Sequence, residues 1–204
     1  MELDHVVLAA ADLDDAAREL QARHGLASVA GGRHPGWGTE NRIVPLGDAY
    51  LELVAVADEE EAACTVFGRR VASAREAPFA PLAWAVRTGD LDAHAARLGL
   101  EIEAGERARP DGTTLRWRLA GVVEAAAEPF LPFFIEWEPG ATLPGAAAVR
   151  HPAGDVRVER LALSGDGARL AAWLGGTHLA VTVRPGAPAL VGVALSGGLS
   201  IGQG

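Results

Sequence analysis

Two glutamates lie in segments where a strand of a soluble protein normally carries apolar side chains. Glu52 lies within Ala-Tyr-Leu-Glu-Leu-Val-Ala-Val at 49–56, and Glu136 lies within Phe-Phe-Ile-Glu-Trp at 133–137. Burying a carboxylate costs several kcal/mol unless it is paired, hydrogen-bonded or bound to a metal. Because the two segments are similar, we predict that Glu52 and Glu136 are catalytic carboxylates of one site between them, where a carboxylate moves a proton.

The segments that carry the glutamates close two similar units. A strand expected at 3–9 precedes Asp-Leu-Asp-Asp at 12–15 and a helix, and a strand expected at 82–87 precedes Asp-Leu-Asp at 90–92 and another helix. Internal repeats of this kind dictate the architecture. We predict an α+β fold in which tandem βαβββ units form a curved-sheet cleft, followed by a small C-terminal βαββ piece. The predicted domains are a first unit with its linker helix (1–75), a second unit (76–140), and a linker with a small α/β appendage (141–204).

A histidine on the first strand adds a further polar group. Strand side chains alternate between two faces, so His5 and Glu52 converge if their faces both line the cleft. In the second unit we place Trp84 at the position of His5, and Glu136 at that of Glu52. One imidazole and two carboxylates with an open coordination position suit a divalent metal such as Mn²⁺, Fe²⁺, Ni²⁺ or Zn²⁺.

Composition restricts the class of protein. The chain has 204 residues, of which 49% are hydrophobic, enough for one domain or two packed half-domains. Its net charge of −9 argues against a nucleic-acid-binding surface, which needs basic residues. All basic residues are Arg, which excludes a Schiff-base or P-loop lysine.

Cysteine content and hydropathy indicate the compartment. Cys64 is the single cysteine, so an intramolecular disulfide and a multi-cysteine zinc site are both excluded. The sequence shows no signal-peptide pattern at Met1 and no apolar run of the roughly 18 residues that a membrane span needs. We therefore expect a cytoplasmic protein without a membrane partner. The abundance of Ala and Gly, with Arg in place of Lys, suggests a GC-rich bacterial genome.

The most specific motif precedes and includes the first glutamate strand. The chain reads His-Pro-Gly-Trp-Gly-Thr-Glu-Asn at 34–41 and Pro-Leu-Gly-Asp-Ala-Tyr-Leu-Glu-Leu at 45–53, after an opening Leu-Asp-His-Val-Val at 3–7. With the tandem units, these motifs resemble a glyoxalase-like domain of the vicinal oxygen chelate superfamily, which includes glyoxalase I, extradiol dioxygenases, methylmalonyl-CoA epimerase and antibiotic-resistance proteins. The motif match covers about residues 2–57, and the second unit matches mainly in architecture and in Glu136.

This resemblance implies a cleft in which the first and last strands of each unit present metal ligands. Carried over by position, these ligands are His5, Glu52 and Glu136. Trp84 stands where many metal-using members place a second histidine, so three of the four positions are kept. We predict substrate contacts from a group of residues in or near the cleft: His34, Trp37, Asn41 and Trp84.

The resemblance leaves several functions open. The first is a metal-assisted isomerase or lyase that acts on a small molecule with vicinal oxygens; a dioxygenase is disfavoured because one histidine is missing. The alternative is a metal-free small-molecule binding protein of the bleomycin-resistance type, with the cleft lined by Trp37, Trp84 and Trp137. A third hypothesis is a degenerate paralogue or a partner subunit that keeps the fold without the chemistry.

Purely structural roles are the remaining alternatives for the charged residues. Glu52 would pair with a buried arginine such as Arg42 or Arg118, and Glu136 would form an ion pair. The paired units close a cleft either within one chain or across a homodimer, and both arrangements are compatible with the spacing.

Overall fold

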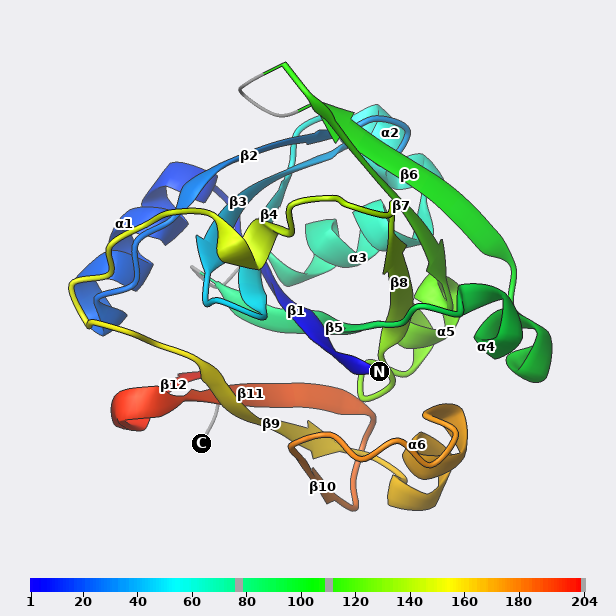
Figure 1. The fold of residues 1–204 in the computed structure, drawn as a ribbon. Coiled ribbons are helices and arrows are strands. Elements are labelled where there is room, and N and C mark those ends of the chain that lie inside the picture. Colours follow the sequence, from blue (N-terminus) through cyan, green and yellow to red (C-terminus); the bar gives the residue numbers. More distant parts are fainter. Residues whose placement is uncertain (76–78, 109–111, 203–204) are drawn as a thin grey trace.

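The computed structural model describes residues 1–75, 79–108 and 112–202. Two sheets build the molecule, one of eight strands and one of four (Figure 1). The first predicted domain boundary, between residues 75 and 76, lies at the edge of the described residues, and the division into three domains stays a prediction.

The first half of the large sheet follows the βαβββ pattern. Its elements are β1 (Glu2–Ala9), α1 (Leu13–His24), β2 (Val29–His34), β3 (Thr39–Pro45) and β4 (Tyr50–Val56). Helix α1 begins after Asp12, whose side chain accepts a hydrogen bond from the backbone N–H of Asp15. The helix ends at Gly25, which has φ of 65°, a left-handed conformation that glycine adopts without strain.

The second half repeats this order with one added helix. Two helices, α2 (Glu59–Cys64) and α3 (Val66–Ala74), connect the halves. The second half then contains β5 (Ala80–Arg87), α4 (Leu91–Leu98), β6 (Ile102–Ala108), β7 (Thr114–Ala120), α5 (Val122–Ala127) and β8 (Phe133–Trp137).

The strand order shows how the halves join. It is β2-β3-β4-β1-β5-β8-β7-β6, with β1 and β5 antiparallel at the centre and each parallel to the last strand of its own half. The two end strands approach each other: an ideal Cβ placed on Gly32 of β2 would lie 3.0 Å from the carbonyl oxygen of Ala108 on β6. The sheet is therefore strongly curved, and the predicted fold class is confirmed.

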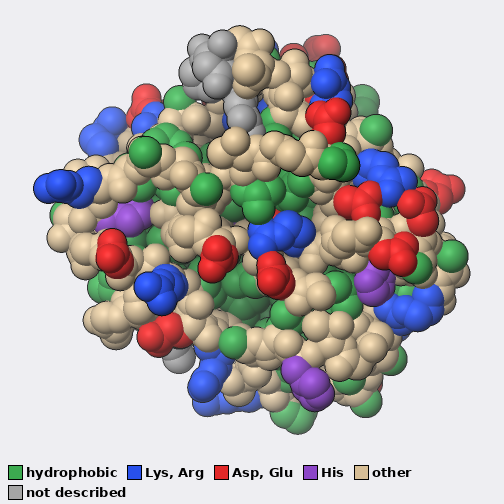
Figure 2. All heavy atoms as spheres, viewed as in Figure 1, with side chains coloured by type: hydrophobic (Ala, Val, Ile, Leu, Met, Phe, Trp, Pro, Cys, Tyr) green, Lys and Arg blue, Asp and Glu red, His purple; other side chains and the backbone are tan. Residues whose placement is uncertain are grey.

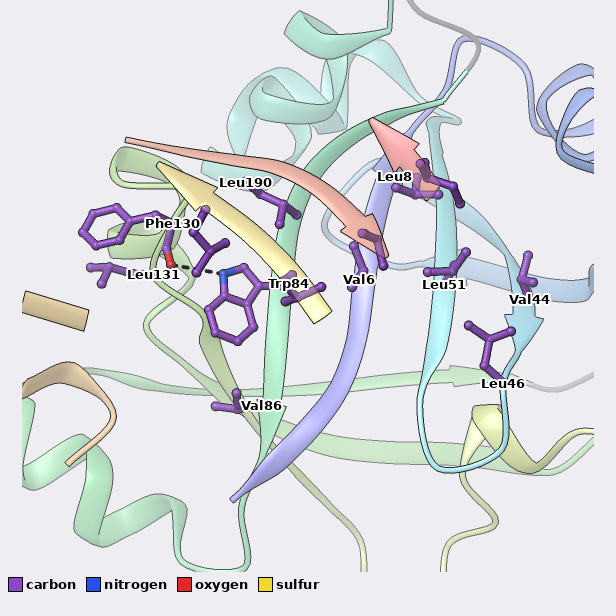
Figure 3. Packing of buried hydrophobic residues seen from close by; sticks show 14 of the residues in the cluster. Val6, Leu8, Val44, Leu46, Leu51, Trp84, Val86, Phe130, Leu131 and Leu190 are labelled. Atoms are coloured by element: carbon purple, nitrogen blue, oxygen red, sulfur yellow. Dashed lines mark hydrogen bonds between the residues drawn. The ribbon is translucent and has the colours of Figure 1, made fainter. Parts of the chain in front are cut away.

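Side-chain alternation along the central strands separates two hydrophobic cores. Val6 and Trp84 belong to the core on the outer face, together with residues of α1 and α4 (Figure 3). Val7 and Ala85 belong to the core on the inner face, together with residues of α3 and α5. Neighbouring residues of one strand thus enter different cores, as the pleat of a strand requires.

The C-terminal sheet covers the outer face. Its elements are β9 (Val158–Ser164), α6 (Gly167–Trp173), β10 (Val181–Arg184), β11 (Ala189–Leu195) and β12 (Leu199–Gly202), with strand order β10-β9-β11-β12. Two short 3₁₀ turns complete the chain, Pro144–Ala146 and Ser196–Gly198. Leu161, Leu190 and Ile201 share the outer core with Val6 and Trp84, so the two sheets pack into one body.

The segment between the sheets, residues 138–157, is fastened to the first half. The backbone N–H of Ala27 donates to Nδ1 of His151 at 3.0 Å, and Nε2 of the same ring donates to the carbonyl of Pro45 at 2.7 Å. The backbone N–H of Gly47 donates to the carbonyl of Gly145 at 3.0 Å. These bonds hold the segment against the loops that flank β3.

The surface carries both signs of charge. On the face shown in Figure 2, acidic and basic side chains are interspersed with hydrophobic and other groups. Among the described residues, no helix is both long and apolar enough to span a membrane.

Candidate functional site

A cavity of about 190 Å³ opens on the inner face of the curved sheet. Its polar side chains include His5, His34, Asn41, Glu52 and Arg107. Its apolar walls are largely aromatic and come from both halves: Trp37, Tyr50, Phe67, Trp117, Phe133 and Trp137. Such a mixture of aromatic walls and a few converging polar groups is typical of a small-molecule site.

Glu52 lies between two imidazoles on the cavity wall. Its Oε2 is 3.5 Å from Nε2 of His5, and its Oε1 is 3.5 Å from Nε2 of His34. The Nδ2 amide group of Asn41 donates a hydrogen bond to Oε1. Only 10% of the glutamate side chain is exposed, so this carboxylate is held by partners rather than by bulk water.

The orientation of Asn41 determines the state of His34. The backbone N–H of Gly32 donates to Oδ1 of Asn41 at 2.9 Å, which turns Nδ2 toward Glu52 and toward Nε2 of His34, 3.1 Å away. Nε2 of His34 therefore accepts, and Nδ1 donates to the hydroxyl of Thr39 at 2.9 Å. This is the neutral imidazole.

Electrostatics favour the same state of His34. Burial is the largest influence and lowers the pKa of His34 below its usual 6.5, while the charge of Glu52 raises that pKa and the charges of Arg107 and His5 lower it. The buried imidazole thus stays uncharged near neutral pH. The neutral His34 ring thus forms part of the cavity wall beside Glu52.

A buried aspartate orients His5. Nδ1–H of His5 donates to Oδ1 of Asp4 at 2.7 Å, and Asp4 is 1% exposed. The other oxygen of Asp4 accepts from the indole N–H of Trp137 at 2.9 Å and from Arg87 at 3.3 Å. Tyr50 stacks on the His5 ring with centroids 4.7 Å apart. Nε2 of His5 is therefore left facing Oε2 of Glu52, 3.5 Å away.

The strand register corrects the predicted equivalence of the two halves. In the parallel pair β1–β4, His5 lies opposite Tyr50 and Glu52 follows two residues later; in β5–β8, Ala85 lies opposite Phe133. The counterparts of His5 and Glu52 are therefore Ala85 and Ile135, one residue away from the predicted Trp84 and Glu136. A one-residue slip exchanges the faces of a strand, so both predicted residues point away from the cavity.

Trp84 is part of the outer core. It is fully buried, and its indole N–H donates to the carbonyl of Phe130 at 3.2 Å (Figure 3). Trp84 is therefore not brought to the cavity where its substrate contact was predicted. The third tryptophan of the cavity is Trp117, whose ring meets Trp137 at a centroid distance of 5.6 Å.

Glu136 has a structural environment outside the cavity. Nε of Arg118 donates to Oε2 of Glu136 at 3.0 Å, and the backbone N–H of Leu91, at the start of α4, donates to Oε1 at 3.2 Å. Glu136 lines a separate hollow on the surface together with Arg116 and Arg118. The predicted set of His5, Glu52 and Glu136 is therefore not brought together. The suggested pairing of Glu52 with Arg118 or Arg42 is also absent, because Arg42 contacts Ser28 and Asp14.

Comparison with known proteins identifies the family. Residues 3–178 match a family described as a glyoxalase-like domain. The chain belongs to this family. The fold and the family place this glyoxalase-like protein in the vicinal oxygen chelate superfamily, as the sequence motifs predict.

Solved structures resemble this glyoxalase-like domain in fold. A hypothetical protein from Staphylococcus aureus is 16% identical with a TM-score of 0.72, and the match covers 95% of this chain and 90% of that chain. A variant of methylmalonyl-CoA epimerase from Streptomyces coelicolor, in complex with 2-nitronate-propionyl-CoA, is 19% identical with a TM-score of 0.50, covering 70% and 98% of the two chains. At these identities the likeness concerns the fold alone. None of the curated proteins compared with the chain matches it.

The glyoxalase-like cavity does not fit the predicted metal centre. Two of the four positions that would supply ligands from both halves carry Ala85 and Ile135, which have no donor atoms. Within residues 1–75, 79–108 and 112–202, no group of three or more His, Cys, Asp or Glu side chains is arranged to hold a metal ion. The polar groups of the cavity instead form hydrogen bonds with protein side chains: Asn41 with Glu52 and His34, and His5 with Asp4.

Sequence reasoning located part of this site and missed part of it. His5, His34, Trp37, Asn41 and Glu52 all line the cavity. Asp4 is adjacent to His5 in the sequence, and its position before a predicted inward-facing histidine was a usable signal. Trp117 and Arg107 lie on β7 and β6, where the strand pairing decides which residues face the cavity. Nothing in the neighbouring sequence indicates that these two residues face inward.

Proposed function

We propose that this glyoxalase-like protein is a small-molecule enzyme of the isomerase or lyase type, which moves a proton on a carbon beside a carbonyl of a substrate with vicinal oxygens. The placement of the Glu52 carboxylate supports this proposal most directly. That carboxylate is nearly buried on the wall of a cavity, between two imidazoles, with Oε1 held by a hydrogen bond from Asn41.

The residues have distinct parts in the proposed reaction. Glu52 takes the proton from the substrate carbon and returns it, because a held carboxylate beside a small cavity is suited to general base catalysis. Asn41 keeps Oε1 in place, so Oε2 is the oxygen that exchanges the proton. His5 faces Oε2, and Asp4 keeps the His5 ring in this orientation.

Aromatic walls would exclude water from the reacting atoms. Trp37 and Phe67 lie with their ring centroids 5.1 Å apart on one side, and Trp117 and Trp137 form the other pair. A low-dielectric environment strengthens electrostatic interactions with the carboxylate and the developing enolate. No step in this proposal requires a metal ion.

Proton exchange tests the proposal. Small 2-oxo and 2-hydroxy acids and amides, pyruvate among them, are incubated with the protein in D₂O, and loss of the signal of the protons on the carbon beside the carbonyl is followed by NMR. Glu52→Gln should slow the enzyme-dependent exchange by roughly 10²–10⁴-fold, the usual contribution of a general base. Glu136→Gln is the matched control, because that glutamate lies outside the cavity, and it should keep the exchange rate.

Two results would count against the proposed mechanism. Full exchange activity in Glu52→Gln would remove this carboxylate from the reaction. Exchange that disappears with a chelator and returns with Mn²⁺, Ni²⁺ or Zn²⁺ would restore the metal-assisted mechanism.

The aromatic lining also favours a second candidate, a metal-free binding protein. Paired rings on both sides of the cavity suit a planar ligand held by stacking. Tight binding of a planar aromatic compound, together with no exchange of any acid or amide in the panel, would favour this function.

A further inference from the structure

Strand β6 buries a charged side chain and exposes a hydrophobic one, the reverse of the usual pattern. Arg107 is 7% exposed and is the one buried residue of Ile102–Ala108, whereas the hydrophobic Ile102 of the same strand is 37% exposed. Burying a guanidinium is costly unless charged or polar partners compensate for the lost water. A strand that places its arginine inside and its isoleucine outside therefore calls for an explanation beyond packing.

The arginine is directed into the cavity. Gly105 and Arg107 are two residues apart on β6, so they lie on the same face of the strand. Both line the cavity beside Trp117 of the neighbouring strand β7. The side chain of Arg107 reaches Gly32 of β2: an ideal Cβ at Gly32 would lie 3.7 Å, an ordinary contact distance, from both Cδ and Nη1 of Arg107. The side chain thus extends from one end strand of the sheet across to the other.

The charge of Arg107 reaches the wall that carries the proposed chemistry. It lowers the pKa of His34, and it opposes the burial that raises the pKa of Tyr50. Since His34 is neutral and Arg87 is bound to Asp4 and Glu2, Arg107 supplies a positive charge at the cavity itself.

A guanidinium on such a wall is suited to a carboxylate. Arginine presents five N–H donors in a planar fork that matches the two oxygens of a carboxylate. The fork is large enough to keep a protein partner and still bind a ligand oxygen. The cavity of about 190 Å³ is comparable with a cavity of about 150 Å³ that takes benzene, which restricts the ligand to a small molecule.

We propose that Arg107 recognises the substrate and that the substrate is a small carboxylic acid with an oxygen on the neighbouring carbon, a 2-oxo or 2-hydroxy acid. Its carboxylate binds the guanidinium, and the carbon that loses the proton faces Glu52. This inference rests on the proposed function, because it assigns the substrate class of the same cavity.

Pyruvate and pyruvamide test the inference. The two compounds have the same shape and number of non-hydrogen atoms, but only pyruvate is charged. Ligand-observed NMR titration of the wild-type protein should show pyruvate binding roughly 10- to 100-fold more tightly than pyruvamide, the factor that corresponds to a hydrogen bond with a charged group. Arg107→Gln should remove this preference by weakening pyruvate alone, and Arg107→Lys should keep part of it.

Arg116→Gln is the matched control. Arg116 lies on the adjacent strand β7, is not among the residues that line the cavity, and is half-exposed in an ion pair with Glu106, so its loss should leave the preference unchanged. Equal affinity of the two compounds in the wild type, including no detectable binding of either, would overturn the inference even if Arg107 variants fail to fold. An undiminished preference in folded Arg107→Gln would do the same.

The inference and the proposed function fail in different ways. Exchange activity that survives in Glu52→Gln would remove the proposed base while leaving the preference for pyruvate intact. Exchange that depends on Glu52 but is equally fast with amides and acids would keep the proposed function and remove the role of Arg107.

Discussion

The two halves of the large sheet have equivalent strand arrangements and different inner faces. In the first half, β1 and β4 present His5 and Glu52 to the cavity, and the end of β2 adds His34. In the second half, the equivalent strands present Ala85 and Ile135 to the inner core. A repeated backbone therefore does not impose repeated chemistry. One half supplies the acid–base groups, the other supplies a guanidinium, and both contribute to the aromatic walls.

Substitutions at the neighbouring residues 84 and 85 of β5 should have the largest effects that test the difference between the two halves. Trp84→His should destabilise the protein by about 3 kcal/mol or more, because it empties part of the outer core and removes the N–H that binds Phe130. It should not raise the affinity for Zn²⁺, because residue 84 points away from the cavity. Urea denaturation and zinc titration measure the two effects.

Ala85→His is the paired variant. Residue 85 lies directly opposite His5 in the antiparallel ladder, so a second imidazole there would supply a zinc ligand beside the first. We expect this variant to bind Zn²⁺ at least about tenfold more tightly than wild type, a gain of about 1.4 kcal/mol. If Trp84→His gained affinity and Ala85→His did not, the register that relates the halves would be wrong.

A smaller loss of stability is expected from a substitution at Gly31, which lies against Asn41 in the first half. A Cβ at Gly31 would lie 1.8 Å from Oδ1 of Asn41, so Gly31→Ala must displace the amide that orients Glu52 and His34. Overpacking of this kind costs about 1–3 kcal/mol, and proton exchange should fall with it. Gly89→Ala is the control, because nothing lies within 4 Å of a Cβ there. Equal stability and activity of both variants would show that Asn41 does not depend on this close approach.

The smallest predicted effect concerns the pH dependence of stability. Burial keeps the pKa of His34 in the folded protein below the 6.5 of an unfolded chain. As the pH falls through this window, the unfolded state binds a proton that the folded state does not, so stability falls with falling pH. The slope from this residue is at most about 1.4 kcal/mol per pH unit. Urea midpoints measured at pH 7.5 and 5.5 should differ less in His34→Gln than in wild type, and an unchanged difference would contradict a buried neutral His34.

Local patterns in the sequence predicted most of the fold. Alternation placed β1 and β4 correctly, the acidic segment that begins at Asp12 precedes α1 as expected, and motif similarity indicated the superfamily. At the C-terminal end, β12 forms because pairing with β11 satisfies its backbone. Long-range pairing of this kind has no local signal.

Register is the part of the site that the sequence left undetermined. Glu136 and Ile135 are adjacent, and each is compatible with a half-buried strand, so only the pairing of β8 with β5 decides which one faces the cavity. Arg107 presents the same difficulty, because the alternation of β6 by hydropathy alone would turn its isoleucine inward. The inward orientation of Arg107 follows only from the pairing of β6 with β7.

The packing of the C-terminal sheet on the outer face has a consequence for assembly and for engineering. That sheet covers Val6 and Trp84 in the way that a second subunit covers an apolar interface, but it is joined covalently and secured through His151. A shortened chain ending near residue 140 would expose this core to water and should aggregate. Because the C-terminal sheet already covers the outer face of the large sheet, self-association of the intact chain has to use another surface.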